Sequence, residues 1–177
     1  GGMAQTRMNA NPMPTWNTNC LTEDYMDDEL FIRKMIEDLS TREEIDCARI
    51  YITGHSMGSG MTQRCLLDMP DIFAAGASNS GVVLGDFELA TTKKNYDVAC
   101  LIEIGEHDVD NFDFQKSDRV RQNLEYWIER GDLQPLEEGG SYSCGRYQNT
   151  VWCNKKGVPM VRYVAAFDKT HSIMPQD

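Results

Sequence analysis

The first stretch with helical spacing of apolar residues lies between Thr22 and Leu39. Its apolar positions are Tyr25, Ile32, Met35, Ile36 and Leu39. Acidic residues fill its first turns, where the helix dipole favours negative charge. We predict a helix over residues 22–39 that is ended by the polar run at residues 40–44.

From residue 48 onward, short apolar runs alternate with helical patterns. The predicted strands cover residues 48–53, 73–78, 99–104 and 160–166. The predicted helices cover residues 57–69, 88–95 and 115–130, with Asp113 as the cap of the last helix and Gly131 as its end. Such alternation is typical of βαβ units, so we predict an α/β fold with a mainly parallel sheet flanked by helices.

Residues 132–157 interrupt the alternation and are rich in glycine and aromatic side chains. We interpret them as a lid-like insertion in a single domain that spans residues 1–177, with a candidate hairpin or lid between Ser141 and Cys153. Two of their aromatic residues, Tyr142 and Trp152, are candidates for a pocket that holds the acyl group of a substrate. The alternative is a surface insertion that packs on its own aromatic side chains.

The composition excludes several classes of protein. The chain has 177 residues, 17 basic and 28 acidic, and hence a formal net charge of −11. It has no basic cluster and no apolar run of the length needed to span a membrane. Binding to nucleic acid or to an anionic membrane is therefore disfavoured, and a neutral or modestly charged substrate fits better.

The six cysteines form no CxxC pair, which argues against a zinc ribbon or a thioredoxin-type site. Cys144 and Cys153 flank a short loop, and we expect them to form a disulfide, which favours an oxidising compartment. The alternative is that most of the cysteines are small buried apolar residues.

The segment Gly54-His55-Ser56-Met57-Gly58 matches the pattern G-x-S-x-G, between a predicted strand and a predicted helix. This context is typical of a nucleophilic serine on a sharp, strained turn, with glycines where Cβ atoms would collide. The Met57 N–H, at the start of the helix, is the expected donor to an oxyanion. The alternative is a glycine-rich turn with a solvated serine.

A serine hydroxyl needs a base, and the chain has three histidines. His171 follows the last predicted strand, where an imidazole can reach the serine, and is the candidate base. We expect His55 to pack against or orient the turn, and we count it with the candidate substrate-binding residues. His107 we expect to be a loop residue.

A third group must orient the imidazole, and Asp108 follows the strand at residues 99–104. Its strand end is expected at the same sheet edge as Ser56, with Asp110 as the alternative acid. The acidic run from Asp108 to Asp113 lacks the spacing of an EF-hand calcium loop. The order Ser56, Asp108, His171 is the order that α/β-hydrolases use.

These motifs resemble a family of α/β-hydrolase esterases, the poly(3-hydroxybutyrate) depolymerases and the feruloyl and acetylxylan esterases. The resemblance is carried by the segments RIYITGHSMGSGMT from Arg49, PDIFAAGA from Pro70 and IGEHD from Ile104, together with His171. It implies hydrolysis of carboxylic esters through an acyl-enzyme without a metal or organic cofactor. It also implies secretion, although the first residues lack the apolar segment of a signal peptide.

The chain departs from that family at its start. The residues before Asp24 are too few and too polar to form the first strands of the fold and the loop with the second oxyanion donor. We expect the C-terminal part of the sheet, with one parallel edge left unpaired. A complementary N-terminal segment or a second copy of the chain would complete it. The alternatives are a peptidase of the prolyl oligopeptidase kind and an inert fragment or binding protein.

Overall fold

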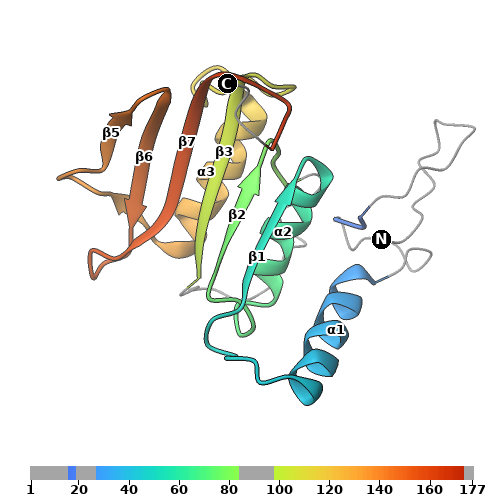
Figure 1. Cartoon of the computed structure of the whole chain (residues 1–177). Coiled ribbons are helices and arrows are strands. Elements are labelled where there is room, and N and C mark those ends of the chain that lie inside the picture. The colour runs from blue at the N-terminus through green and yellow to red at the C-terminus, as the bar shows by residue number, and fades with distance from the viewer. Residues whose placement is uncertain (1–15, 19–26, 84–97, 174–177) are drawn as a thin grey trace, which may run out of the picture.

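The computed structural model describes residues 16–18, 27–83 and 98–173, and its elements alternate as the sequence predicts (Figure 1). They are α1 (Asp28–Arg42), β1 (Tyr51–His55), α2 (Met57–Asp68), β2 (Ala75–Asn79), β3 (Ala99–His107), α3 (Asp118–Gly131), β4 (Gln134–Pro135), β5 (Ser141–Cys144), β6 (Tyr147–Cys153) and β7 (Pro159–Thr170). The predicted helix at residues 88–95 lies outside the described residues.

One mixed sheet has the strand order β1-β2-β3-β7-β6-β4, and β5 pairs with β6. The neighbouring pairs among β1, β2, β3 and β7 are parallel, whereas β6 runs antiparallel to β7. The four parallel strands are the four that the sequence predicts, and they lie side by side. Among the described residues β1 pairs only with β2, so it is an edge of the sheet. This is the partial α/β-hydrolase fold that the motifs predict.

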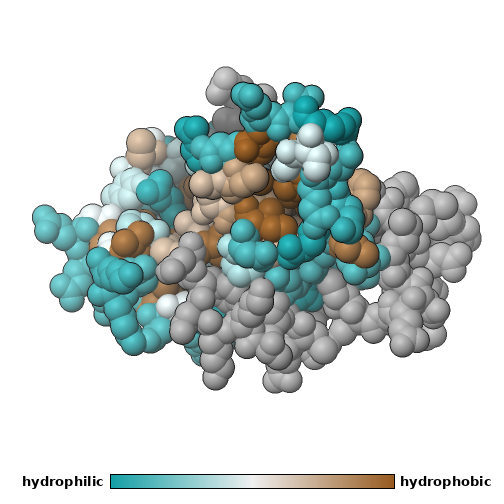
Figure 2. Space-filling view, turned by 90° about the horizontal axis from the view of Figure 1, so that it is seen from below, coloured by the Kyte–Doolittle hydropathy of each residue, from teal (hydrophilic) through white to brown (hydrophobic). Residues whose placement is uncertain are grey.

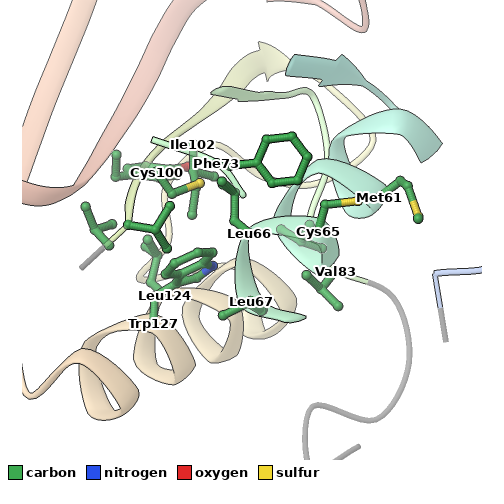
Figure 3. Close-up of a cluster of buried hydrophobic side chains, with 14 of the residues drawn as sticks. Met61, Cys65, Leu66, Leu67, Phe73, Val83, Cys100, Ile102, Leu124 and Trp127 are labelled. Carbon is green, nitrogen blue, oxygen red and sulfur yellow. The ribbon is translucent and has the colours of Figure 1, made fainter. Parts of the chain in front are cut away.

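Helices α2 and α3 lie against the same face of the sheet (Figure 1). Between them and the sheet, Leu66, Ile102, Leu124 and Trp127 form part of a buried hydrophobic cluster (Figure 3). The buried Gln63 joins the two helices, because its side-chain oxygen accepts hydrogen bonds from Asn123 Nδ2 at 2.9 Å and from Trp127 Nε1 at 2.8 Å. Its amide nitrogen also donates to Ser78 Oγ on β2, at 2.8 Å. These core contacts fix the position of α2 relative to the carboxyl end of β1.

The opposite, amino-terminal end of the parallel strands faces the viewer in Figure 2, where hydrophobic side chains gather among hydrophilic ones. A hollow of about 210 Å³ lies at this end, lined by residues of β2, β3 and β7 and by neighbouring positions. It contains none of the residues singled out for chemistry. No helix in the described part of the chain is long and apolar enough to cross a membrane.

Three helix boundaries differ from the prediction. Helix α1 begins at Asp28, with the Asp27 side chain capping it, rather than at residue 22. The polar run at residues 40–44 does not end α1 at Leu39, because the helix continues to Arg42, with the Ser40 hydroxyl donating to the Ile36 carbonyl at 2.8 Å. Helix α3 is capped by Ser117, whose side chain accepts from the Val120 N–H, rather than by Asp113. The Asp113 carboxylate instead accepts from the Gln115 N–H at 3.0 Å, in the turn before the helix.

The segment 132–157 supplies β4, β5 and β6 to the sheet, and β5 and β6 form an antiparallel hairpin, as one of the two interpretations of residues 141–153 predicts. The expected Cys144–Cys153 disulfide is wrong, and both thiols are free. Cys144 pairs with Tyr147 at one end of β6, and Cys153 is the last residue at the other end. Six residues of extended strand span about 20 Å, whereas a disulfide needs Cα atoms within about 7 Å.

Candidate active site

Ser56 occupies the strained turn between β1 and α2. Its backbone has φ 57° and ψ −119°, a conformation that side-chain-bearing residues rarely adopt. Gly54 permits this turn, because a Cβ at that position would lie 2.1 Å from the Gly58 carbonyl oxygen. A Cβ on Gly58 would meet nothing within 4 Å, so the second glycine of the motif is not required by a collision of its own. The turn presents the Ser56 side chain at the carboxyl edge of the sheet.

His171, just beyond β7, links Ser56 to Asp108. Its Nε2 lies 2.8 Å from Ser56 Oγ, and its Nδ1 lies 2.7 Å from Asp108 Oδ1. Asp108 directly follows β3, so the three side chains come from the carboxyl ends of three parallel strands. In the tautomer that donates from Nδ1 to the carboxylate, Nε2 is free to accept the serine proton. The structure thus brings together the three residues that the sequence singled out.

The Asp108 carboxyl is almost completely buried, with 2% of its side chain exposed. Burial by itself would raise the pKa of Asp108, but interactions with His171, Ser80 and the Val109 N–H outweigh it and lower the pKa. The Val109 amide donates to Oδ1 at 2.7 Å. The alternative acid, Asp110, instead accepts from Arg119 Nη1 at 3.0 Å. Asp108 is therefore the carboxylate held ionised beside the imidazole.

His55 lies beside the base rather than beside the nucleophile's oxygen. Its ring centroid is 4.7 Å from that of His171, with the ring planes tilted by 48°. Its pKa is lowered, first by burial and then by the charges of His171 and Lys169, although Asp108 opposes them. Its buried Nε2 has no hydrogen-bond partner among the described residues. A neutral His55 packed on His171 agrees with a role in orienting the turn.

His107 is not part of the hydrogen-bonded set of Ser56, His171 and Asp108. It lies next to Asp168, with 4.0 Å between His107 Nε2 and Asp168 Oδ1. Together with Glu106 these side chains bring metal-ligating atoms within 4.8 Å of one another. His107 and Asp168 are well exposed, and exposed acidic groups of this kind are common without an ion. Glu106, His107 and Asp168 therefore lie outside the hydrogen-bonded set of Ser56, His171 and Asp108.

Two hollows flank the Ser56 turn. The smaller, of about 130 Å³, is lined by Ser56, Met57, Ser80, Gly81, Val82, Val109, Asp110, Arg119 and His171. The larger, of about 540 Å³, runs between β1, α2 and Ile32 of α1 and includes Trp16. Met57 is the first residue of α2, so its N–H belongs to the amides that a helix leaves without an internal partner. An oxyanion beside Ser56 would face this helix terminus.

The aromatic candidates of the segment 132–157 are not near Ser56 in the sheet. Trp152 lies on β6, buried in the hydrophobic core, with its ring 6.2 Å from that of Phe114. Tyr142 is exposed on β5, which pairs with β6. Strands β2, β3 and β7 separate β6 from the strand that carries the serine. Neither residue lines a hollow that contains Ser56.

Sequence reasoning missed two residues behind Asp108, Ser80 and Lys169. Both are almost fully buried, and Lys169 Nζ donates to Ser80 Oγ at 2.8 Å. Lys169 stands in a polar run next to His171, and Ser80 follows β2, so both patterns are typical of a surface loop. The two side chains meet because the ends of β2 and β7 lie at the same edge of the folded sheet. The local spacing of residues does not encode this meeting.

The sheet and the strand–turn–helix around Ser56 are those of the α/β-hydrolase fold. The chain belongs to the prolyl oligopeptidase family, whose model matches residues 23–127.

Curated relatives lie among the esterases. The chain is 35% identical over 63 residues to poly(3-hydroxyalkanoate) depolymerase C of Paucimonas lemoignei, a match that covers 36% of this chain and 14% of that protein. It is 35% identical over 66 residues to feruloyl esterase B of Piromyces equi, covering 37% of this chain and 12% of that protein. The matches therefore span only a small part of either relative.

Among solved structures, the fold is similar to that of an acetyl xylan esterase from Aspergillus awamori, with a TM-score of 0.65 and 15% identity. That match covers 82% of this chain and 62% of the esterase. It is also similar to SOBER1 of Arabidopsis thaliana, with a TM-score of 0.53 and 16% identity, covering 82% of this chain and 55% of SOBER1. These likenesses support the fold, and they span less than two thirds of either structure.

Proposed function

We propose that the protein is a serine esterase that hydrolyses carboxylic esters through an acyl-enzyme. The observation that carries the proposal is the position of His171, within 2.8 Å of Ser56 Oγ and 2.7 Å of Asp108 Oδ1. A serine hydroxyl is a weak nucleophile until an oriented base accepts its proton. This arrangement supplies the base and its orienting carboxylate together.

In the proposed reaction His171 Nε2 takes the proton from Ser56 Oγ as the oxygen attacks the ester carbonyl. The Met57 N–H stabilises the oxyanion, together with a second donor from outside the described residues. His171 then gives the proton to the leaving alcohol, and water repeats the sequence on the acyl-enzyme. Asp108 stays ionised throughout, in agreement with its lowered pKa.

The substrates we propose are acetyl or feruloyl esters of plant polysaccharides, or hydroxyalkanoate esters. The names of the relatives, a poly(3-hydroxyalkanoate) depolymerase and a feruloyl esterase, support this class. The small hollow beside Ser56 and His171, about 130 Å³, favours a small acyl group within it. A single water molecule fills about 30 Å³ of liquid, so this hollow suits an acetyl or hydroxybutyryl group better than a feruloyl group. An extracellular location is part of the proposal, supported by the resemblance and not by the cysteines.

We further propose that a complementary segment or a second copy of the chain completes the sheet at β1. Two observations support this. The edge of β1 has no strand beside it among the described residues, and Tyr51 on it is 65% exposed. Helix α1 leaves Leu30, Phe31 and Met35 exposed, each by 44% or more. A strand added beside β1 would cover an edge that is otherwise open to aggregation. The loop that connects this strand to the rest of the fold could supply the second oxyanion donor.

A peptidase is the second candidate, favoured by the match to the prolyl oligopeptidase family. A fluorophosphonate probe, a panel of nitrophenyl esters and a peptide amide separate the candidates. We expect labelling at Ser56, ester hydrolysis, and no cleavage of the amide. Ser56→Ala should abolish labelling, and Ser40→Ala, which alters a serine in helix α1, should not. An unlabelled wild type would favour an inert fragment, and cleavage of the amide would favour the peptidase.

A further inference from the structure

Lys169 carries a charged ammonium group into the interior behind the Ser56 site. Only 1% of its side chain is exposed. Its Nζ donates to Ser80 Oγ at 2.8 Å and lies 3.3 Å from Glu103 Oε1. Burying a charge costs free energy unless the charge is paired and hydrogen-bonded, so a lysine this deeply buried suggests a specific structural role.

An irregularity of β7 turns this lysine inward. Gly105 pairs with Ala166 and His107 with Thr170, so three residues of β7 lie opposite one residue of β3. Within this bulge Asp168 has φ 54°, in the left-handed region. Gly105 allows the bulge to approach β3, because a Cβ there would lie 2.4 Å from the Lys169 carbonyl oxygen. Bulges commonly re-aim a side chain next to an active site.

Ser80 occupies the space between Lys169 and Asp108. Its backbone also has a positive φ, 57°, and its N–H donates to the Glu103 carbonyl at 2.8 Å. The Ser80 hydroxyl lowers the pKa of Asp108. Asp108 Oδ1 already accepts from His171 and Val109, whereas the buried Oδ2 has no partner of ordinary geometry among the described residues. Oδ2 is therefore the oxygen that remains open to the Ser80 proton.

A hydroxyl has one proton to donate, and a neighbouring cation decides where that proton points. When the Lys169 ammonium donates to Ser80 Oγ, the Ser80 proton must point away from Lys169. The Glu103 carboxylate already balances the charge of Lys169, with its Oε1 3.3 Å from the lysine Nζ. The acceptor left for the Ser80 proton is the Asp108 carboxylate.

We propose that Lys169 is a positioning residue, whose ammonium group directs the Ser80 hydroxyl to Asp108 and so holds the carboxylate in the orientation that aligns His171 with Ser56. This inference rests on the proposed function. It assigns no contact with the substrate to Lys169, which acts through Ser80 and Asp108. Its charge also contributes to the lowered pKa of His55, after burial and the charge of His171.

The test compares Lys169→Met, Lys169→Arg, Ser80→Ala and the double variant Lys169→Met/Ser80→Ala with the wild type. One readout is kcat and KM for nitrophenyl acetate together with the rate of fluorophosphonate labelling. The other is the low-field proton resonance of the His171 Nδ1–H bond to Asp108, which needs no turnover. Lys156→Met, at an exposed lysine, is the matched control.

We expect Lys169→Met and Ser80→Ala each to lower kcat by about 10–100-fold, the size of coupling within one hydrogen-bonded network, with KM nearly unchanged. The low-field resonance should weaken or shift in both variants. The double variant should be no slower than the slower single variant, because both act through one path. Lys169→Arg, which keeps a charge and donors, should recover most of the activity.

Wild-type kcat and an unaltered resonance in folded Lys169→Met would overturn the inference, as would losses that multiply in the double variant. Ser80→Ala removes one oxygen only, so if Lys169→Met does not fold, wild-type kcat and an unaltered resonance in Ser80→Ala would still overturn the inference. A wild type that shows the resonance but neither labels nor hydrolyses esters would refute the proposed function instead. The resonance comparison would then still decide whether Lys169 positions Asp108.

Discussion

His171 Nε2 lies 2.8 Å from Ser56 Oγ, although 115 positions separate the two residues in the sequence. The two are carried by β1 and β7, which are not neighbours, because β2 and β3 lie between them. His171 must therefore reach across two strand ends, and Asp108 at the end of β3 supports it on the way. The predictions below test this arrangement and the core that supports it.

The two acidic candidates should separate clearly on substitution. Asp108→Asn should lower kcat for nitrophenyl acetate by about 10³–10⁴-fold, because an amide cannot hold the imidazole in the tautomer with a free Nε2. Asp110→Asn is the matched control, since Asp110 pairs with Arg119, and should keep kcat within about fivefold of the wild type. Steady-state kinetics on both purified variants provides the measurement. A larger loss for Asp110→Asn would reverse the assignment.

The small hollow beside Ser56 should limit the acyl group. We expect kcat/KM for nitrophenyl acetate to exceed that for the feruloyl ester by about tenfold or more, since poor fit of extra atoms costs about 1–3 kcal/mol. Val82→Ala, at a buried residue that lines the hollow, should raise butyryl relative to acetyl activity. Val158→Ala, at a half-exposed residue elsewhere, should leave the ratio unchanged. Equal rates on both esters would refute the size limit.

The buried Gln63 should be important for stability. Gln63→Met keeps the length of the side chain but leaves Asn123 Nδ2 and Trp127 Nε1 without their acceptor. We expect the free energy of unfolding to fall by about 2–4 kcal/mol, and Tm by roughly 5–10 °C. Gln122→Met, at an exposed position of α3, should change stability by less than about 0.5 kcal/mol. Thermal melts followed by circular dichroism check both, and a Gln63→Met melt at the wild-type temperature would contradict the prediction.

Asp68 should make the folded state less stable as pH rises toward neutrality. Burial, followed by the charge and hydrogen bond of Glu29, raises the pKa of Asp68 to about 7, against the opposing effect of Arg64 and Arg130. Between the ordinary carboxyl range, about pH 4, and pH 7, the folded chain binds a proton that the unfolded chain has lost. The contribution of the protonated form is therefore present at low pH and lost as pH rises through 7.

The measurement is Tm from pH 5 to pH 8 for the wild type and for Asp68→Asn, which cannot ionise. We expect the decline in Tm over this range to be smaller in the variant. Glu44→Gln, at an exposed carboxyl, is the control and should keep the wild-type slope. Parallel curves for the wild type and Asp68→Asn would show that the proton is not held there.

The sequence predicted the strands and the turn around the serine because each of these elements carries its own local signal. The apolar run before Gly54 and the glycine at that position specify a strand that enters a tight turn, and the structure has both. Asp108 and His171 follow strand ends, so their meeting follows from a parallel sheet. The extent of β7 and its bulge could not be predicted, because residues 168–170 are polar and resemble a loop.

The pairing of the segment 132–157 with the main sheet could not be predicted for a related reason. The glycines and exposed aromatic residues of this segment are typical of a surface insertion, yet β6 is buried against β7 through Val151, Trp152 and Cys153. Pairing with a strand that comes later in the chain is a non-local property, which spacing does not reveal. The disulfide prediction failed with it, because a loop would bring the two cysteines together and an extended strand keeps them apart.

The bulge in β7 also sets how far the chain travels before it reaches His171. With regular pairing, Asp168 would stand opposite His107, whereas the structure places Thr170 there. Two extra residues are thus absorbed before the strand ends, whereas regular pairing of the same residues would carry His171 further beyond the edge of the sheet. The reach of His171 toward Ser56 is therefore sensitive to insertions and deletions at residues 167–169, even though these residues lie at the surface or behind the site.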